Sequence, residues 1–208
     1  MIEKYIELLT ISAFHSEVVE MERKSEKQSF FSCLMSVNFK VGAPSDIKCA
    51  YKERSVFCLN MKEALRNNNR VLSLLKESIF KDVRETLLTT NQWIRKGLRA
   101  TTKPERLEET YRALDKELHA LFQLGGSCSV HQNETAACKA GLQSLCDTTF
   151  LLMFALGDIA EGKQQEAITK AYLAVRDPSV NANETCPDLY YKTGIAILEA
   201  FGKSGPLV

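Results

Sequence analysis

The chain has 208 residues, a mass of 23.4 kDa and a net charge of +1 at pH 7, with 45% hydrophobic and 25% charged residues. This length favours one domain over two, and the hydrophobic fraction excludes an intrinsically disordered chain. A near-neutral chain gives no reason to expect a nucleic-acid partner. We therefore expect residues 1–208 to form a single globular domain that does not bind nucleic acid.

Apolar residues recur every three or four positions along most of the chain, which predicts an all-α fold. In chain order the expected helices cover residues 2–25, 28–37, 47–66, 69–98, 102–124, 135–159, 164–175 and 187–201. A Gly- and Pro-containing loop at 39–46 and an asparagine cluster at 67–69 separate the early helices. We expect six to eight helices in one bundle.

The helix that begins at Thr102 has the clearest end signals. Thr102 and Glu105 match a capping box, and the pair Gly125–Gly126 is expected to end the helix. One face of it is apolar and consists of Leu107, Tyr111, Leu114, Leu118 and Leu121. Pro187 suits the first turn of the last helix.

The longest apolar region covers residues 140–160 and is interrupted by Gln143, Asp147 and Asp158. A membrane span would have about 20 apolar residues with few or no charges. We therefore predict a central helix that is buried on nearly all sides, and no transmembrane segment.

Seven cysteines are present, no two of them closer than eight residues: Cys33, Cys49, Cys58, Cys128, Cys138, Cys146 and Cys186. This spacing contains no CxxC motif, so we expect neither a metal nor a cofactor. Within the expected helices, Cys49 is too far from Cys58, and Cys138 too far from Cys146, for a disulfide. We expect disulfides between different helices or loops, with at least one cysteine left over; buried reduced thiols are the alternative.

Two glycosylation acceptor motifs, at Asn133 and Asn183, each lie close to a cysteine, as in exposed loops of an extracellular protein. The first 14 residues contain Glu3, Lys4 and Glu7 and lack the apolar core of a signal peptide. We therefore expect an extracellular protein whose leader is absent from this chain. A cytoplasmic location is the alternative.

No phosphate-binding loop, HExxH, GxGxxG or GxSxG motif occurs, so no catalytic residue is predicted. Charge is divided unevenly: residues 1–104 carry a net charge of +6 and residues 105–208 a net charge of −5. A basic surface for an anionic partner would be centred on Arg95, Lys96, Arg99 and Lys103. The alternative is an ordinary distribution of charges on solvated helix faces.

Residues 93–99 combine the only tryptophan of the chain with three cations and a glycine. Trp93 with Arg95 and Lys96 has the chemistry to stack on a sugar ring or bind a phosphate. The alternative is a helix end at which Trp93 packs inward and Gly97 stops the helix.

These residues resemble the tryptophan–basic–basic–Gly–Leu signature of the glycolipid transfer protein family. Residues 30–39 are similar to the segment that precedes the headgroup-binding aspartate of that family, and Asp46 follows at a similar distance. Tyr111 and His119 resemble a tyrosine and a histidine on a later helix of the family.

The resemblance implies an all-helical lipid carrier in which Asp46 and Trp93 bind a sugar headgroup and His119 contacts the lipid amide. The chain departs from the family pattern at Ala50 and Glu53, where the family has an amide or cation and a cation. The spacing from Trp93 to His119 is also shorter than in the family.

The leading prediction is a non-enzymatic, extracellular helical binding protein, stabilised by disulfides, that engages a protein partner or an apolar ligand. The first alternative is an intracellular glycolipid or sphingolipid carrier, and the second is an enzyme with an unrecognised His/Cys site. The candidate ligand-binding residues are Asp46, Trp93, Arg95, Lys96 and His119.

Overall fold

The computed structural model describes residues 47–76, 78–130, 136–175 and 186–200, all within the compact unit Ala43–Val208. These residues form helices and no β strand, which confirms the all-α prediction. The elements are α4 (Val56–Leu74), the 3₁₀ helix η2 (Ser78–Phe80), α5 (Lys81–Arg99), α6 (Lys103–Val130), α7 (Ala136–Ile159), α8 (Lys163–Val175) and α10 (Cys186–Ala200). The expected helices at 2–25 and 28–37, as well as Asp46, Cys33, Asn133 and Asn183, lie outside the described residues.

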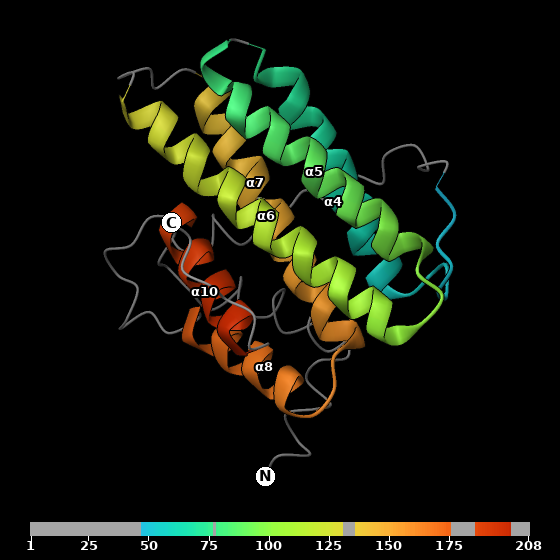
Figure 1. Cartoon of the computed structure of the whole chain (residues 1–208). Coiled ribbons are helices and arrows are strands. Elements are labelled where there is room, and N and C mark those ends of the chain that lie inside the picture. Colours follow the sequence, from blue (N-terminus) through green and yellow to red (C-terminus); the bar gives the residue numbers. More distant parts are fainter. Residues whose placement is uncertain (1–46, 77, 131–135, 176–185, 201–208) are drawn as a thin grey trace, which may run out of the picture. The chain divides into compact units, whose positions relative to one another are not determined.

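Four long helices, α4 to α7, run side by side, and α8 and α10 form a second, shorter pair (Figure 1). Helix α4 packs on α5 and α7, and α6 packs on the same two helices. Consecutive long helices are antiparallel, because short connections join them. This is the up-down-up-down arrangement of a four-helix bundle. Helix α10 packs on α8, α6 and α7.

Helix α7 is the central helix that the apolar region predicts. It contacts α4, α6, α8 and α10 and buries residues such as Leu145, Leu152 and Leu156 among them. By length and composition α7 is apolar enough to cross a membrane, yet 56% of its most apolar window is buried within the structure. The burial identifies it as the core helix of the bundle.

The predicted start of α6 is confirmed, and its predicted end is wrong. The Thr102 hydroxyl accepts a hydrogen bond from the Glu105 amide at 3.4 Å, and the Glu105 carboxylate accepts one from the Thr102 amide at 3.3 Å. The helix then continues through Gly125 and Gly126 to Val130. Neither glycine has the positive φ angle that ends a helix. Glycine inside a helix costs only about 1 kcal/mol, so the helix tolerates both.

Two boundaries near the start of the described chain also differ from the prediction. Helix α4 begins at Val56 rather than residue 47, because the Ser55 hydroxyl caps it by accepting from the Cys58 amide at 3.2 Å. The asparagines at 67–69 do not interrupt the helix, because neighbouring helices supply hydrogen-bond partners for two of them: Asn68 donates to Glu117 and Asn69 accepts from Asn91. The break falls after Leu74 instead.

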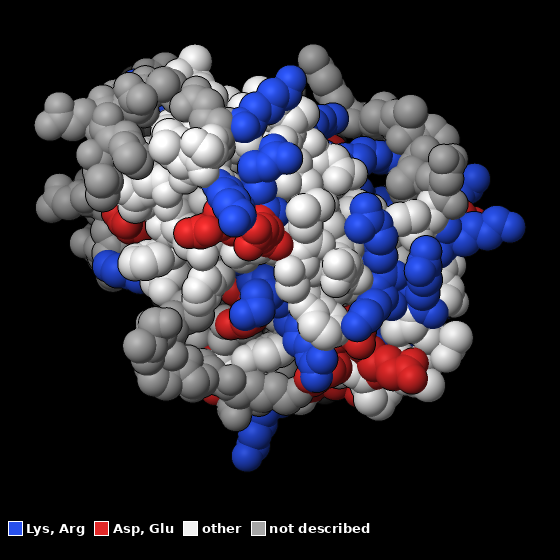
Figure 2. All heavy atoms as spheres, turned by 45° about the horizontal axis from the view of Figure 1, so that its top comes forward, with Lys and Arg blue, Asp and Glu red and all other residues white. Residues whose placement is uncertain are grey.

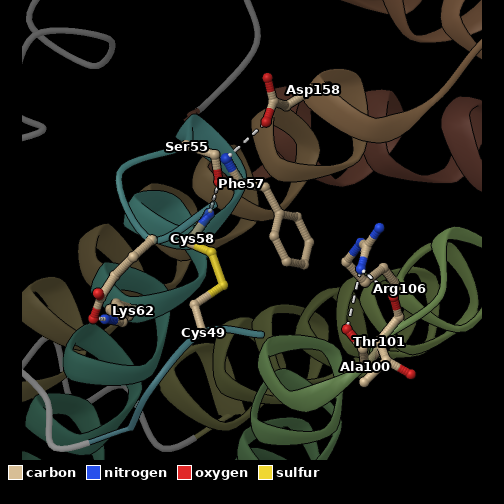
Figure 3. The surroundings of a disulfide bond; sticks show 10 residues. Cys49, Ser55, Phe57, Cys58, Lys62, Ala100, Thr101, Arg106 and Asp158 are labelled. Carbon is tan, nitrogen blue, oxygen red and sulfur yellow. Dashed lines mark hydrogen bonds and ion pairs between the residues drawn. A yellow bond between two sulfur atoms is a disulfide. The ribbon is translucent and has the colours of Figure 1, made fainter. Parts of the chain in front are cut away.

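Two disulfides are present in the described part of the chain. Cys49 and Cys58 pair with their Cα atoms 6.0 Å apart, which corrects our prediction that they lie too far apart (Figure 3). That prediction assumed a helix across both, whereas Cys49 lies in the non-helical segment 47–55. Cys128 pairs with Cys138, 6.1 Å away, and joins the end of α6 to the start of α7, as expected of a bridge between different helices.

Cys146 does not form a disulfide, contrary to its inclusion among the candidates. It lies in the middle of α7, buried and with a free thiol. Helix packing around α7 leaves it among apolar side chains, where a thiol behaves as a small hydrophobic group. Cys33 and the side chain of Cys186 lie outside the described residues.

Candidate functional site

Trp93 lies half-buried on α5, at the contact between α5 and α6. The Lys96 ammonium lies 4.0 Å from the centre of the indole ring, and the Arg112 guanidinium on α6 lies 4.8 Å from it. Both distances allow cation–π attraction. The Glu108 carboxylate accepts a hydrogen bond from Arg112 Nε at 2.9 Å and so orients this guanidinium. Trp93 is therefore held between two cations, one from each helix.

Gly97 does not end α5, which continues to Arg99. A Cβ atom at position 97 would lie 2.7 Å from Met61 Cε and 3.4 Å from Thr110 Oγ1. The glycine therefore lies where α4 and α6 approach this point of α5 closely, and a larger residue would displace the end of the Met61 side chain. The predicted role as a helix stop is wrong.

The end of α5 is also the place where a second basic segment meets it. The Ala50 amide donates a hydrogen bond to the Leu98 carbonyl at 2.8 Å, which fixes the segment 47–55 against the last turn of α5. Exposed Lys48 and Lys52 lie two residues on either side of this bond. Lys and Arg side chains gather on the right of Figure 2, on the side where α5 ends in Figure 1.

We call this group the α5 cation cluster; its members are Lys48, Lys52, Arg95, Lys96 and Arg99. All are exposed except Arg95, which is half-exposed, and no ion pair joins any of them to a carboxylate of the described chain. Lys103, predicted to belong to the basic surface, is instead paired with Glu161.

His119 does not join the Trp93 group. It lies on α6 seven residues after Arg112, about 10 Å further along the helix. The residue is half-buried, and its Nδ1 atom is buried without a hydrogen-bond partner in the described structure. Of the five predicted ligand-binding residues, the structure brings Trp93, Arg95 and Lys96 to one region of α5, leaves His119 apart and does not describe Asp46.

A carboxyl group that the sequence analysis passed over lies in the core. Glu117 on α6 is fully buried, and Asn68 Nδ2 on α4 donates a hydrogen bond to its Oε2 at 2.8 Å. Its Oε1 and the Asn68 Oδ1 have no partner among the described residues. Burial raises the pKa of Glu117 to about 8, with the Asn68 hydrogen bond opposing this rise. The signal in the sequence was its position beside Leu114 and Leu118 on the apolar face.

The buried Cys146 thiol is poorly suited to nucleophilic chemistry. Burial raises its pKa, and the negative charges of Asp147 and Glu117 raise it further. Since the thiolate is the reactive form, this thiol is held in its inert form. No group of three or more His, Cys, Asp or Glu side chains is arranged to hold a metal ion within residues 47–76, 78–130, 136–175 and 186–200.

The chain matches no protein-family model, no curated protein and no solved structure. The glycolipid transfer resemblance therefore stays a prediction. What the site can do must be argued from the chemistry of its own residues.

Proposed function

We propose that this chain is a non-enzymatic binding protein of an extracellular compartment, which presents a fixed helical surface to a macromolecular partner. The observation that carries the proposal is the pair of disulfides, Cys49–Cys58 and Cys128–Cys138, which lock the ends of three of the four long helices. Disulfides persist in oxidising compartments and are rare in the cytosol. In the chain-entropy model, closing a loop of about ten residues stabilises the fold by about 3 kcal/mol.

The placement of the reactive side chains supports binding over catalysis. Glu117 and Cys146 lie in the core, where Asn68 and apolar neighbours surround them. His119 lies on α6 and forms no hydrogen bond with either. A catalytic group must reach a substrate, so these residues serve the fold better than a reaction. The exposed side chains of the described chain include Arg99 and Lys96, which lie near the half-buried Trp93, and arginine and tryptophan are common at binding surfaces.

Close helix contacts favour a partner on the outside over an apolar ligand within the bundle. A Cβ atom at Gly194 of α10 would lie 2.6 Å from the Leu118 side chain of α6, and one at Gly97 would meet Met61 of α4. The helices thus approach until side chains fill the space of the missing methyl groups. Interiors packed in this way leave little room for a lipid chain.

Non-reducing peptide mapping tests the compartment. The full chain, produced through an oxidising secretory pathway, is alkylated in denaturant and digested. We expect peptides that link Cys49 to Cys58 and Cys128 to Cys138, together with an alkylated Cys146. A natively folded chain whose four pairing cysteines are all alkylated would overturn the proposal.

Binding is tested with the labelled, oxidised full chain and extracellular material from the organism that encodes it. We expect saturable retention that unlabelled chain displaces. Native mass spectrometry of the same preparation is the companion measurement. A co-purifying glycolipid with no saturable surface binding would replace the proposal with the lipid-carrier alternative.

A further inference from the structure

None of the five cations of the α5 cation cluster forms an ion pair with a carboxylate of the described chain. Seven others form ion pairs: Lys62, Arg66, Arg70, Lys81, Lys103, Arg112 and Lys116. Two acidic residues close to the cluster in sequence are engaged elsewhere: Glu53 pairs with Lys62, and Glu105 caps α6. No ion pair with a carboxylate of the described residues therefore compensates the positive charge of the cluster.

Repulsion within the cluster makes it costly to keep without a ligand. Arg95 and Arg99 are four residues apart on α5, a spacing at which like charges destabilise a helix by a few tenths of a kcal/mol. Lys96 lies between them in sequence. An anion that bridges these side chains would remove the repulsion, and the strength of the interaction would fall with salt.

The non-helical part of the cluster is held in place before any ligand arrives. The Cys49–Cys58 disulfide (Figure 3) fixes the segment that carries Lys48 and Lys52. The hydrogen bond from the Ala50 amide to the Leu98 carbonyl fixes it further. Tyr51 adds a third anchor, since the Arg106 guanidinium lies 4.4 Å from its ring. Pre-organised cations lose less conformational entropy on binding than cations on a free segment.

We infer that the α5 cation cluster binds a sulfated polysaccharide, which rests on the extracellular placement in the proposed function. The cluster demands a ligand with several anionic groups, because its cations extend from α5 onto the segment 47–55. The anionic lipids of a cell membrane face the cytoplasm, away from an extracellular protein. Sulfated polysaccharides are the extracellular polymers with this charge.

Heparin serves as the probe. The variant Arg95→Gln/Lys96→Gln/Arg99→Gln removes three cluster cations, and Arg66→Gln/Arg70→Gln/Lys116→Gln removes three ion-paired cations as the control with equal net charge. Affinity for heparin at 0.15 M NaCl is expected to fall on the order of 100-fold for the first variant. The control should change affinity by less than about 3-fold. Circular dichroism and thermal unfolding verify that both variants fold.

The variant Cys49→Ser/Cys58→Ser separates pre-organisation from charge. It keeps all five cations but frees the segment, so heparin affinity should fall while the slope of log Kd against log salt stays that of the unmodified chain. The triple cluster variant should instead reduce the magnitude of this slope by about three, which corresponds to three fewer released counterions. An unchanged affinity in both variants would show that the cluster does not form the site.

Three further ligands decide the chemical class. Desulfated heparin should lose the binding, and single-stranded DNA and phosphatidylserine vesicles should bind more weakly than heparin. Equal losses of affinity in the cluster variant and its control, or tighter binding to DNA or vesicles, overturn the inference. Saturable binding to extracellular material that heparin does not displace would support the proposed function and contradict this inference. If all cysteines of the native protein are reduced, both the proposed function and this inference are wrong.

Discussion

The core of the bundle and the end of α5 deal with charge in opposite ways. In the core, Glu117 is fully buried, and burial raises its pKa to about 8, so the carboxyl group is neutral over most of the acidic range. At the end of α5, the cationic side chains of Arg95, Lys96 and Arg99 are in contact with water and have no carboxylate partner among the described residues. The comparison shows that burial decides whether a charge is removed by a proton or remains available to a ligand.

The largest effect is expected from Glu117→Gln. The folded pKa of Glu117, about 8, lies above the usual 4.5, so the folded state holds a proton that the unfolded chain releases. Stability therefore decreases as pH rises from 4.5 to 8, by up to about 5 kcal/mol. Glutamine keeps the shape and cannot ionise, so the variant should lose this dependence. Urea unfolding at pH 5, 6.5 and 8 measures it.

Glu199→Gln is the matched control, because Glu199 is exposed on α10. It should leave the pH dependence of the unfolding free energy unchanged. If the unfolding free energies of wild type and Glu117→Gln change in parallel from pH 5 to pH 8, then Glu117 is ionised in the folded state. The proposed contrast between the core and the end of α5 would then be wrong.

A pair of leucines sharpens the same contrast without charge. Leu114 is fully buried on α6, whereas Leu88 on α5 is 51% exposed. Leu114→Ala should lower the unfolding free energy by about 2–5 kcal/mol, because it leaves a cavity in the core. Leu88→Ala should change it by less than about 0.5 kcal/mol. Similar losses from both substitutions would mean that Leu88 is covered in solution.

Two helical glycines provide a smaller test. A methyl group at Gly194 would meet the Leu118 side chain at 2.6 Å, whereas one at Gly126 has no atom within 4 Å. Gly194→Ala should destabilise the fold by about 1–3 kcal/mol through overpacking. Gly126→Ala should stabilise it by about 0.5–1 kcal/mol through helix propensity. Thermal unfolding of the two variants compares them, and a stabilising Gly194→Ala would refute the close contact.

The smallest effect belongs to the α5 end itself. Arg95→Gln should change the unfolding free energy by less than about 0.5 kcal/mol, because no ion pair is lost. A loss above about 1 kcal/mol in urea unfolding would give Arg95 a structural role and weaken the case for a ligand.

Local sequence signals predicted much of this fold. The apolar periodicity predicted α7 and the buried face of α6, and the Thr102–Glu105 capping box marked the start of α6 to within a residue. The predicted helix boundaries were wrong where a residue bonds to a partner that is distant in the sequence. Asn68 stays helical because Glu117 accepts its hydrogen bond across the bundle, a contact 49 residues away in sequence.

The candidate site divides in the same way. Trp93 and Lys96 are neighbours on one helix, so the sequence alone could pair them. Arg112 reaches Trp93 only because α6 packs on α5, and Lys48 joins the cluster only because the segment 47–55 turns back onto α5. The disulfide between Cys49 and Cys58 was missed for the same reason: the helix boundary on which the distance argument relied was misplaced.

The short separations of the disulfides have a consequence for biosynthesis. Cys49 and Cys58 are nine residues apart, and Cys128 and Cys138 are ten. Each of these four cysteines is thus oxidised with its next neighbour along the chain, and loops of this length close in well under a microsecond. Pairing can proceed in order as the polypeptide emerges, before the bundle assembles. Once the core has closed, the unreactive Cys146 thiol cannot exchange with either bond, which protects the finished connectivity.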